Sequence, residues 1–176
     1  WQLEHLLNEV RANREYLSSG KLPSLPATIE FQDVGFAYPG KRVMREADVT
    51  LSAGELTTIV GPSGAGKTTI ADLVAGLHQP TEGSVKIGGL PLSEIDMAGW
   101  RRQLGYIPQD SILFNDTIIN NITLGDPGIS RGQVEAALKA ADAWGFVSKL
   151  PGEMDFTIGV RGSLLSGGQR QRLAIA

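Results

Sequence analysis

The chain has 176 residues, of which 41% are hydrophobic, enough for one domain with a buried core or one domain with an appended arm. Its formal net charge is −3, with both signs mixed along the chain, so no nucleic acid partner is expected from bulk charge. The absence of cysteine excludes disulfides, thiolate metal sites and a cysteine nucleophile. No apolar run in the sequence is long enough to span a bilayer.

The first segment, residues 1–17, repeats leucine and valine at helical spacing and predicts an amphipathic helix that buries one face. Residues 18–26 contain Gly20, Pro23 and Pro26 and predict an extended linker. The sequence starts at a tryptophan and stops at Ala176 inside a helical pattern. We therefore expect a fragment of a longer polypeptide, whose first helix either belongs to an upstream domain or packs as a plain terminal helix.

The pattern changes from Thr28 onward. Strands are predicted by alternation and apolar runs at 28–38, 47–52, 56–60, 83–89 and 104–109. Helices are predicted at 67–77, 98–103, 117–122, 130–140 and 143–150, with a final helix after the glycine-rich stretch at 159–169. Strands followed by helices indicate an α/β core with a separate helical lobe.

The stretch "GPSGAGKTT" at 61–69 lies between a predicted strand and a predicted helix. Backbone N–H groups can surround phosphate oxygens where glycine lets the chain curl, and the positive end of a helix points to the same place. Lys67 adds a charged donor for the outer phosphates, and Thr68 adds a hydroxyl suited to Mg²⁺. The spacing matches the phosphate loop, which kinases, GTPases and motor ATPases share. The predicted nucleotide-binding residues are Gly61, Pro62, Ser63, Gly64, Ala65, Gly66, Lys67, Thr68 and Thr69.

A second glycine-rich helix start is "LSGGQ" at 165–169. Ser166 can cap a helix, and Gln169 three residues later can complete a capping box. Gly167 and Gly168 let an anion approach the exposed N–H groups of the first turn. A well-capped helix with nothing bound is the alternative interpretation of this stretch taken alone.

Together with the phosphate loop, "LSGGQRQRLAIA" resembles the signature of the nucleotide-binding domain of ATP-binding cassette (ABC) transporters. The resemblance runs from about Thr28 to Ala176. In "FAYPG", Tyr38 stands where the family stacks an aromatic ring on adenine. In "GYIPQD", Gln109 stands at the family's glutamine switch, which touches Mg²⁺ and the attacking water. Taken alone, the two residues would be a strand-edge tyrosine and a polar residue that ends a strand.

The resemblance implies an α/β fold: a P-loop NTPase core with an antiparallel β subdomain and a helical subdomain, its C-terminal part missing. Residues 1–27 would be a helix and linker from a preceding transmembrane domain, and 28–176 a partial nucleotide-binding domain. The segment "QDSILFNDTIINNI" at 109–122 looks like the exporter branch, where this lobe meets the membrane domain. The expected location is the cytoplasmic face of a membrane.

In this family two such domains sandwich ATP, so the expected partners are a second nucleotide-binding domain, identical or different, and a transmembrane domain. Lys67 and Gln109 would act in catalysis on bound ATP, with Thr68 and Gln109 holding Mg²⁺. A partner's ATP would be contacted in trans by Ser166, Gly167, Gly168 and Gln169. ATP binding would join the two domains, and hydrolysis would weaken the contact and drive export.

Several features depart from the family pattern. The family's later Asp–Glu pair and histidine are not in the sequence, and neither His5 nor His78 fits that role. Exporters usually carry an acidic residue where Val160 stands, and Leu164 is commonly polar or basic in relatives. Two alternatives to an exporter ATPase are a non-membrane ABC ATPase and a nucleotide-binding regulatory domain without turnover.

Overall fold

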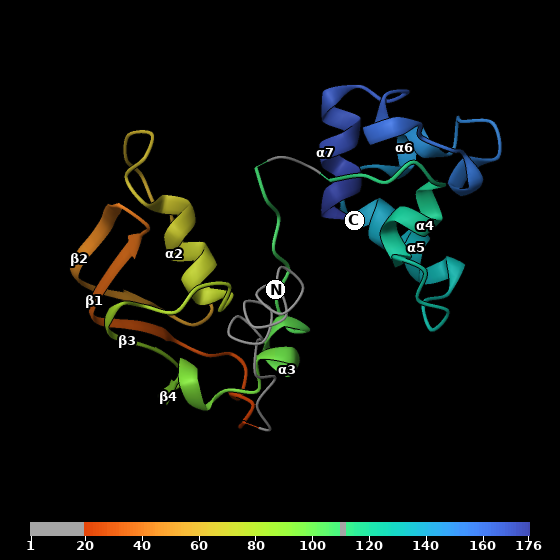
Figure 1. Ribbon diagram of the computed structural model, residues 1–176. Helices are drawn as coiled ribbons and strands as arrows, with labels where there is room; N and C mark the ends of the chain where they lie inside the picture. Colours follow the sequence, from red (N-terminus) through yellow and green to blue (C-terminus); the bar gives the residue numbers. More distant parts are fainter. Residues whose placement is uncertain (1–19, 110–111) are drawn as a thin grey trace, which may run out of the picture. The chain divides into compact units, whose positions relative to one another are not determined.

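The computed structural model describes residues 20–109 and 112–176 (Figure 1). The amphipathic helix predicted at 1–17 lies outside the described residues. Two compact units follow each other along the chain, the first ending at Gly105 and the second beginning at Tyr106. The first unit contains the sheet and the second is built from helices. The prediction of strands first and a helical lobe afterwards is therefore confirmed.

The first unit is built on one antiparallel sheet with the strand order β2-β1-β3-β4. Its strands are β1 (Ile29–Tyr38), β2 (Lys41–Leu51), β3 (Glu82–Ile87) and β4 (Leu90–Pro91). A tight turn that contains Gly40, at φ 76°, joins β1 to β2 and makes Tyr38 and Lys41 cross-strand partners. The strand predicted at 47–52 is the last part of the longer β2 strand.

Two helices and a short 3-10 turn complete the first unit: α2 (Lys67–Val74), η1 (Leu92–Glu94) and α3 (Met97–Arg101). Leu73 of α2 and Trp100 of α3 join the buried cluster that Phe31 and Val34 supply from the sheet. The indole Nε1 of Trp100 donates a hydrogen bond of 2.9 Å to the carbonyl oxygen of Val74. This bond ties α3 to the end of α2, which stops earlier than predicted.

Two predicted strands, 56–60 and 104–109, are absent from the described structure, and both predictions are wrong. Each segment is apolar enough for a buried strand, but neither pairs with a strand of the described sheet. Leu56 is 96% exposed and Val60 is 86% exposed, so these two apolar side chains are not buried against a core either. A strand needs a neighbouring strand for its backbone N–H and C=O groups, and hydropathy alone does not supply one.

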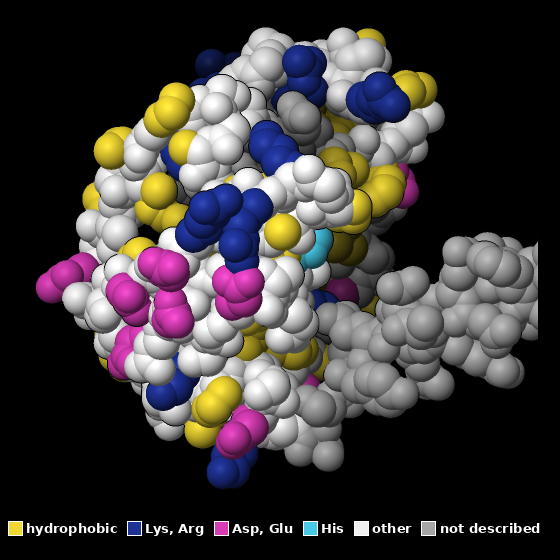
Figure 2. All heavy atoms as spheres, turned by 60° about the vertical axis from the view of Figure 1, so that its left-hand side comes forward, with side chains coloured by type: hydrophobic (Ala, Val, Ile, Leu, Met, Phe, Trp, Pro, Cys, Tyr) yellow, Lys and Arg dark blue, Asp and Glu magenta, His cyan; other side chains and the backbone are white. Residues whose placement is uncertain are grey.

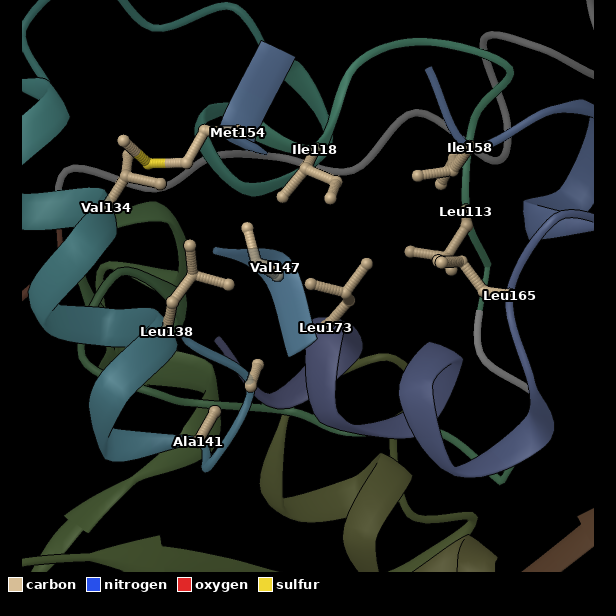
Figure 3. Close-up of a cluster of buried hydrophobic side chains, with 11 residues drawn as sticks. Leu113, Ile118, Val134, Leu138, Ala141, Val147, Met154, Ile158, Leu165 and Leu173 are labelled. Atoms are coloured by element: carbon tan, nitrogen blue, oxygen red, sulfur yellow. The ribbon is translucent and has the colours of Figure 1, made fainter. Parts of the chain in front are cut away.

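The second unit consists of short helices around its own buried cluster. Its elements are α4 (Ile118–Thr123), α5 (Arg131–Ala140), α6 (Trp144–Val147), η2 (Glu153–Asp155), η3 (Val160–Gly162) and α7 (Gly167–Ile175). Figure 3 shows side chains from α4, α5, α6 and α7 pointing into one centre, among them Ile118, Leu138, Val147 and Leu173. The helical predictions for this part are confirmed, although α6 is shorter than the predicted 143–150.

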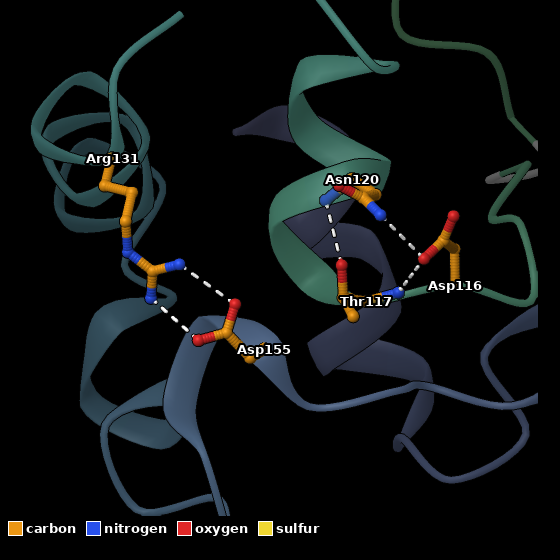
Figure 4. Close-up of polar contacts among 5 residues, drawn as sticks. All are labelled: Asp116, Thr117, Asn120, Arg131 and Asp155. Atoms are coloured by element: carbon orange, nitrogen blue, oxygen red, sulfur yellow. Dashed lines mark hydrogen bonds and ion pairs between the residues drawn. The ribbon is translucent and has the colours of Figure 1, made fainter. Parts of the chain in front are cut away.

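An ion pair fastens α5 to η2 at the surface of the second unit (Figure 4). The guanidinium of Arg131 donates two hydrogen bonds of 2.9 Å, one to each carboxylate oxygen of Asp155. These bonds favour the ionised carboxyl and lower the pKa of Asp155 below its ordinary value of 3.8. The same contact raises the pKa of Arg131. Both groups are exposed, so the pair is sensitive to salt.

Candidate functional site

The loop at 61–66 leads directly into α2 and has the backbone that its glycines predict. Gly64 and Gly66 have φ values of 80° and 88°, a region that side chains with a Cβ rarely adopt. Gly66 is the N-cap of α2, and the first turn of this fully described helix has neither a capping side chain nor an acidic residue. The N–H groups that begin a helix attract anions, so this turn suits a phosphate group.

Lys67 is the first residue of α2 and folds its side chain back over the loop. Its Nζ donates hydrogen bonds of 3.0 Å to the carbonyl oxygen of Gly61 and 2.7 Å to that of Pro62. The ammonium group therefore sits above the same turn that presents the helix N-terminus. A positive charge and the start of a helix act together at one place, as binding of a polyphosphate requires.

The β1–β2 hairpin lies against this loop, a relationship that sequence reasoning missed. A Cβ placed on Gly66 would come within 2.9 Å of Cγ1 of Val43, and one placed on Gly64 would lie 4.0 Å from Nζ of Lys41. The close approach to Val43 requires glycine at 66. Lys41 brings a second ammonium group towards the loop. Val43 and Gly66 are 23 positions apart in the chain, so no local sequence signal indicated this arrangement.

Tyr38 is the last residue of β1 and stands next to Lys41 across the hairpin. Its side chain is 37% exposed, while Phe36 two residues earlier is buried. The two rings meet edge to face at 90°, with their centroids 4.9 Å apart. Tyr38 therefore presents a supported aromatic ring at the end of the hairpin that borders the loop.

The candidate Mg²⁺ ligand in the first unit is Thr68, which is exposed on the first turn of α2, whereas the neighbouring Thr69 is buried. Mg²⁺ prefers hard oxygen ligands and usually keeps substrate phosphates and water in its coordination shell. No group of three His, Cys, Asp or Glu side chains suited to a metal occurs among the described residues. A hydroxyl beside a phosphate-binding turn fits an ion that arrives with its nucleotide.

The second glycine-rich helix start is Ser166, the N-cap of α7. Its hydroxyl oxygen accepts a hydrogen bond of 3.3 Å from the N–H of Gln169, and Oε1 of Gln169 accepts one of 2.8 Å from the N–H of Ser166. The predicted capping box is therefore confirmed. Because the hydroxyl acts as an acceptor here, its proton remains able to donate to an anion. Gly167 and Gly168 are both exposed beside it.

Arginine guanidinium groups border this helix start. Arg170 donates a hydrogen bond of 2.7 Å from Nη1 to the carbonyl oxygen of Leu165, which fastens the turn before the cap. The guanidinium of Arg172 lies 5.7 Å from the ring centroid of Phe146 on α6. The first turn of α7 contains no acidic residue. Like the start of α2, it is therefore a place where negative charge is favoured.

Gln109 is exposed in an irregular segment at the start of the second unit. The strand that was predicted to carry it is not formed. The phosphate loop belongs to the first unit, and Gln109 and the capped serine belong to the second. The loop, Lys67 and Tyr38 therefore lie within one unit.

A pocket of about 560 Å³ opens in the second unit, lined by Phe114, Asp116, Asn120, Leu124 and Gly125. One carboxylate oxygen of Asp116 accepts hydrogen bonds of 2.6 Å from the N–H of Thr117 and 2.9 Å from Nδ2 of Asn120 (Figure 4). These bonds, that of Asn120 first, lower the pKa of Asp116 and keep the carboxyl ionised at neutral pH. The pocket thus combines exposed apolar side chains with one fixed negative charge.

Side chains of both charge signs are exposed on the face drawn in Figure 2, with apolar ones between them. This mixture agrees with the near-neutral net charge. Within residues 20–109 and 112–176, no helix has the length and apolar character needed to cross a bilayer.

Comparison with known proteins agrees with this geometry. A profile described as "ABC transporter" matches residues 44–176. The chain is 40% identical over 156 residues to an ATP-dependent lipid A-core flippase of Syntrophus aciditrophicus, covering 89% of this chain and 26% of the flippase. It is 38% identical over 167 residues to the heterocyst differentiation ATP-binding protein HepA of Nostoc sp., covering 93% of this chain and 28% of HepA.

A solved structure, that of a bacterial Atm1-family ABC exporter with ATP bound, superimposes with a TM-score of 0.88 at 36% identity. It covers 98% of this chain, which in turn covers 31% of the exporter chain. The chain thus spans only about a quarter of the length of these two relatives, 26% of the flippase and 28% of HepA.

Proposed function

The chain belongs to the ABC transporter family and has the ABC ATPase fold, and we propose that it is an ATP-binding and hydrolysing motor domain of an exporter. The observation that carries the proposal is the position of Lys67, whose ammonium is held over the carbonyl oxygens of Gly61 and Pro62 beside the uncapped start of α2. This arrangement has the hydrogen-bond donors that a nucleoside triphosphate needs. The flippase and the exporter among its relatives support transport as the purpose.

Bound ATP would lie with its phosphates over the loop at 61–66 and the first turn of α2. Backbone N–H groups would bind the inner phosphates, and Lys67 would exchange its carbonyl partners for outer phosphate oxygens. Thr68 would hold Mg²⁺ together with phosphate oxygens and water, and Gln109 would contribute a side-chain oxygen to the ion and to the attacking water. Mg²⁺ supplies charge neutralisation of the phosphates when bound. Tyr38 would stack on the base.

The signature residues Ser166, Gly167, Gly168 and Gln169 would act on the ATP of a second copy or a related domain. The start of α7 offers helix N–H groups, a hydroxyl proton and no acidic residue, which are features suited to a γ-phosphate. Two such domains would close head to tail around ATP. Hydrolysis would remove the γ-phosphate contact that favours the closed state, and the pair would open.

The pocket at Phe114 and Asp116 is the proposed contact with a transmembrane domain. Its exposed apolar side chains suit an amphipathic segment, and the ionised carboxyl of Asp116 suits a basic residue on that segment. Val160 begins η3 and is exposed, so this position offers an apolar contact in place of the acidic one that exporters usually have. The domain would therefore work at the cytoplasmic face of a membrane.

The test is ATP binding and turnover by the full-length protein in lipid nanodiscs. Gln109→Ala should retain ATP·Mg²⁺ binding and lose turnover, since the residue is proposed to act on the ion and the water. Gln103→Ala removes another exposed glutamine side chain, one outside the proposed machinery, and should keep the wild-type rate. A wild-type protein that binds no ATP would refute the proposal, and so would wild-type turnover by Gln109→Ala.

A further inference from the structure

We propose that His78 is a positioning residue, which holds the ring of Tyr38 in the plane in which it stacks on the nucleotide base. This inference rests on the proposed ATP-binding function, which supplies the base. It gives a role to a histidine that fits none of the family's motifs. The observations that support it are the geometry of three aromatic rings, the anchoring of the turn that carries His78, and the position of the β1–β2 hairpin.

The rings of Phe36, Tyr38 and His78 form a closed group in which each touches the other two. The centroid distances are 4.9 Å for Phe36–Tyr38, 5.3 Å for Phe36–His78 and 5.4 Å for Tyr38–His78. Tyr38 meets both neighbours nearly at right angles, at 90° and 88°, while Phe36 and His78 are tilted by 35° to each other. Rotation of the tyrosine ring would break both edge contacts at once.

His78 lies in the turn that follows α2, and hydrogen bonds fasten this turn on both sides. Before it, Arg101 donates from Nε to the carbonyl oxygen of Ala75 at 3.0 Å and from Nη2 to that of Gly76 at 2.7 Å. After it, both the N–H and the hydroxyl of Thr81 donate to the carbonyl oxygen of Gly35, at 2.9 and 3.0 Å. The backbone on both sides of His78 is therefore fixed to α3 and to β1, and this holds the imidazole against Tyr38.

The same hairpin brings Tyr38 to the phosphate loop. Lys41, the cross-strand partner of Tyr38, extends its ammonium towards Gly64, and Val43 closes on Gly66. A nucleotide whose phosphates lie on the loop thus has its base end close to this hairpin. Phe36 is buried and cannot reach such a base, so Tyr38 supplies the exposed ring and the other two rings support it.

One helix connects both ends of the proposed site. α2 begins with Lys67 at the proposed phosphate site, and the turn at its other end carries His78 in contact with the ring of Tyr38. Phosphate contacts do not depend on the plane of Tyr38, whereas base stacking does. Loss of the imidazole should therefore weaken binding of a nucleotide and leave binding of a triphosphate that lacks a base unchanged.

The experiment measures dissociation constants of the full-length protein for ATP and for inorganic tripolyphosphate, both with Mg²⁺, by calorimetry. The variants are Tyr38→Ala, His78→Ala, His78→Gln and His78→Phe. We expect His78→Ala and His78→Gln to weaken ATP binding about two- to tenfold, the scale of one aromatic contact. Tripolyphosphate binding should stay at the wild-type value. His78→Phe restores a ring and should restore ATP binding, which a merely polar role would not allow.

The outcomes separate this inference from the proposed function. If the wild type binds neither ligand, the proposed function fails and the role of His78 fails with it. If Tyr38→Ala weakens ATP binding while His78→Ala and His78→Gln bind ATP normally, only the role of His78 is refuted. Equal losses for ATP and tripolyphosphate would show a structural role and overturn the inference too. If His78→Ala does not fold, the contrast between His78→Gln and His78→Phe decides in the same way.

Discussion

The ammonium of Lys67 lies 2.7 Å from the carbonyl oxygen of Pro62, a residue five positions earlier in the loop that it covers. The lysine is thus held over the turn by the loop's own backbone. Its charge is already directed at the space where phosphate would bind, so little side-chain freedom remains to be lost on binding.

Lys67→Ala is expected to weaken ATP binding roughly 10- to 150-fold, because a hydrogen bond to a charged group contributes about 1.5–3 kcal/mol. Equilibrium titration of ATP on the full-length protein measures the effect. Lys149→Ala makes the same change of charge at an exposed position in the second unit and should leave the affinity unaltered. Unchanged affinity in Lys67→Ala would contradict the assigned role.

Two helices of the second unit begin with the same capping box, which offers a matched pair of variants. Ser130 caps α5 with Gln133 as Ser166 caps α7 with Gln169. Ser130→Ala and Ser166→Ala should each lower stability by about 0.5–2 kcal/mol, the usual effect of losing a serine cap. Thermal melting should therefore give similar shifts for the two variants.

Turnover should distinguish them. Only Ser166 is proposed to contact a partner's ATP, so Ser166→Ala should slow ATP hydrolysis and domain closure, and Ser130→Ala should not. ATP binding by a nucleotide-binding domain that is not paired with its partner should be normal in both variants. A similar loss of hydrolysis in the two variants would assign Ser166 to stability alone.

Gly66→Ala tests how the hairpin and the phosphate loop fit together. A left-handed backbone costs a residue with a Cβ about 1–2 kcal/mol, and here the new methyl group would also meet Val43 at 2.9 Å. Gly40→Ala has a similar φ of 76° but no atom within 4 Å of the added carbon, so it measures the backbone effect alone. In thermal melting, Gly66→Ala should have a lower melting temperature than Gly40→Ala. Adding Val43→Ala to Gly66→Ala should recover part of the difference, because it removes the side chain that the new methyl group meets.

The ion pair of Arg131 with Asp155 predicts a pH dependence of local stability. The folded-state pKa of Asp155 is lowered, so its contribution is complete above the ordinary value of 3.8 and is lost as the pH falls through the folded value. Compared with Asp155→Asn, the wild type should have the more protected α5 amides at pH 6, and the difference should shrink below about pH 4.

Amide hydrogen exchange, corrected for intrinsic rates, gives the measurement. Adding Arg131→Ala to Asp155→Asn should produce no further effect, because the partner is already neutral. A difference that persists unchanged to pH 2.5 would mean that the carboxyl does not act through its charge. High salt should reduce the difference at every pH, since both groups are exposed.

Local sequence patterns predicted the elements whose partners lie nearby in the chain. The alternation of apolar and polar residues identified β1, and the spacing of Ser166 and Gln169 identified the capping box at α7, because both are decided within a few residues. The phosphate-loop pattern likewise predicted a glycine-rich turn at the start of α2. The box at Ser130 has the same spacing and could have been found in the same way.

Features that depend on distant segments could not be predicted. The apolar run at 56–60 has the composition of a strand but no neighbouring strand within the described residues. The approach of Val43 to Gly66 and the contact of His78 with Tyr38 join positions 23 and 40 residues apart, and follow from how β2 and the turn after α2 are placed. Periodicity contains no information about such distances.

The two buried clusters, one around Phe31 and Leu73 and the other around Ile118 and Leu138, have no residue in common. The phosphate loop is attached to the first and the Ser166 cap to the second. A destabilising substitution in one buried cluster can therefore impair one proposed activity and spare the other. Such variants would fall into two classes: those that still bind their own nucleotide and those that still contact the nucleotide of a partner domain.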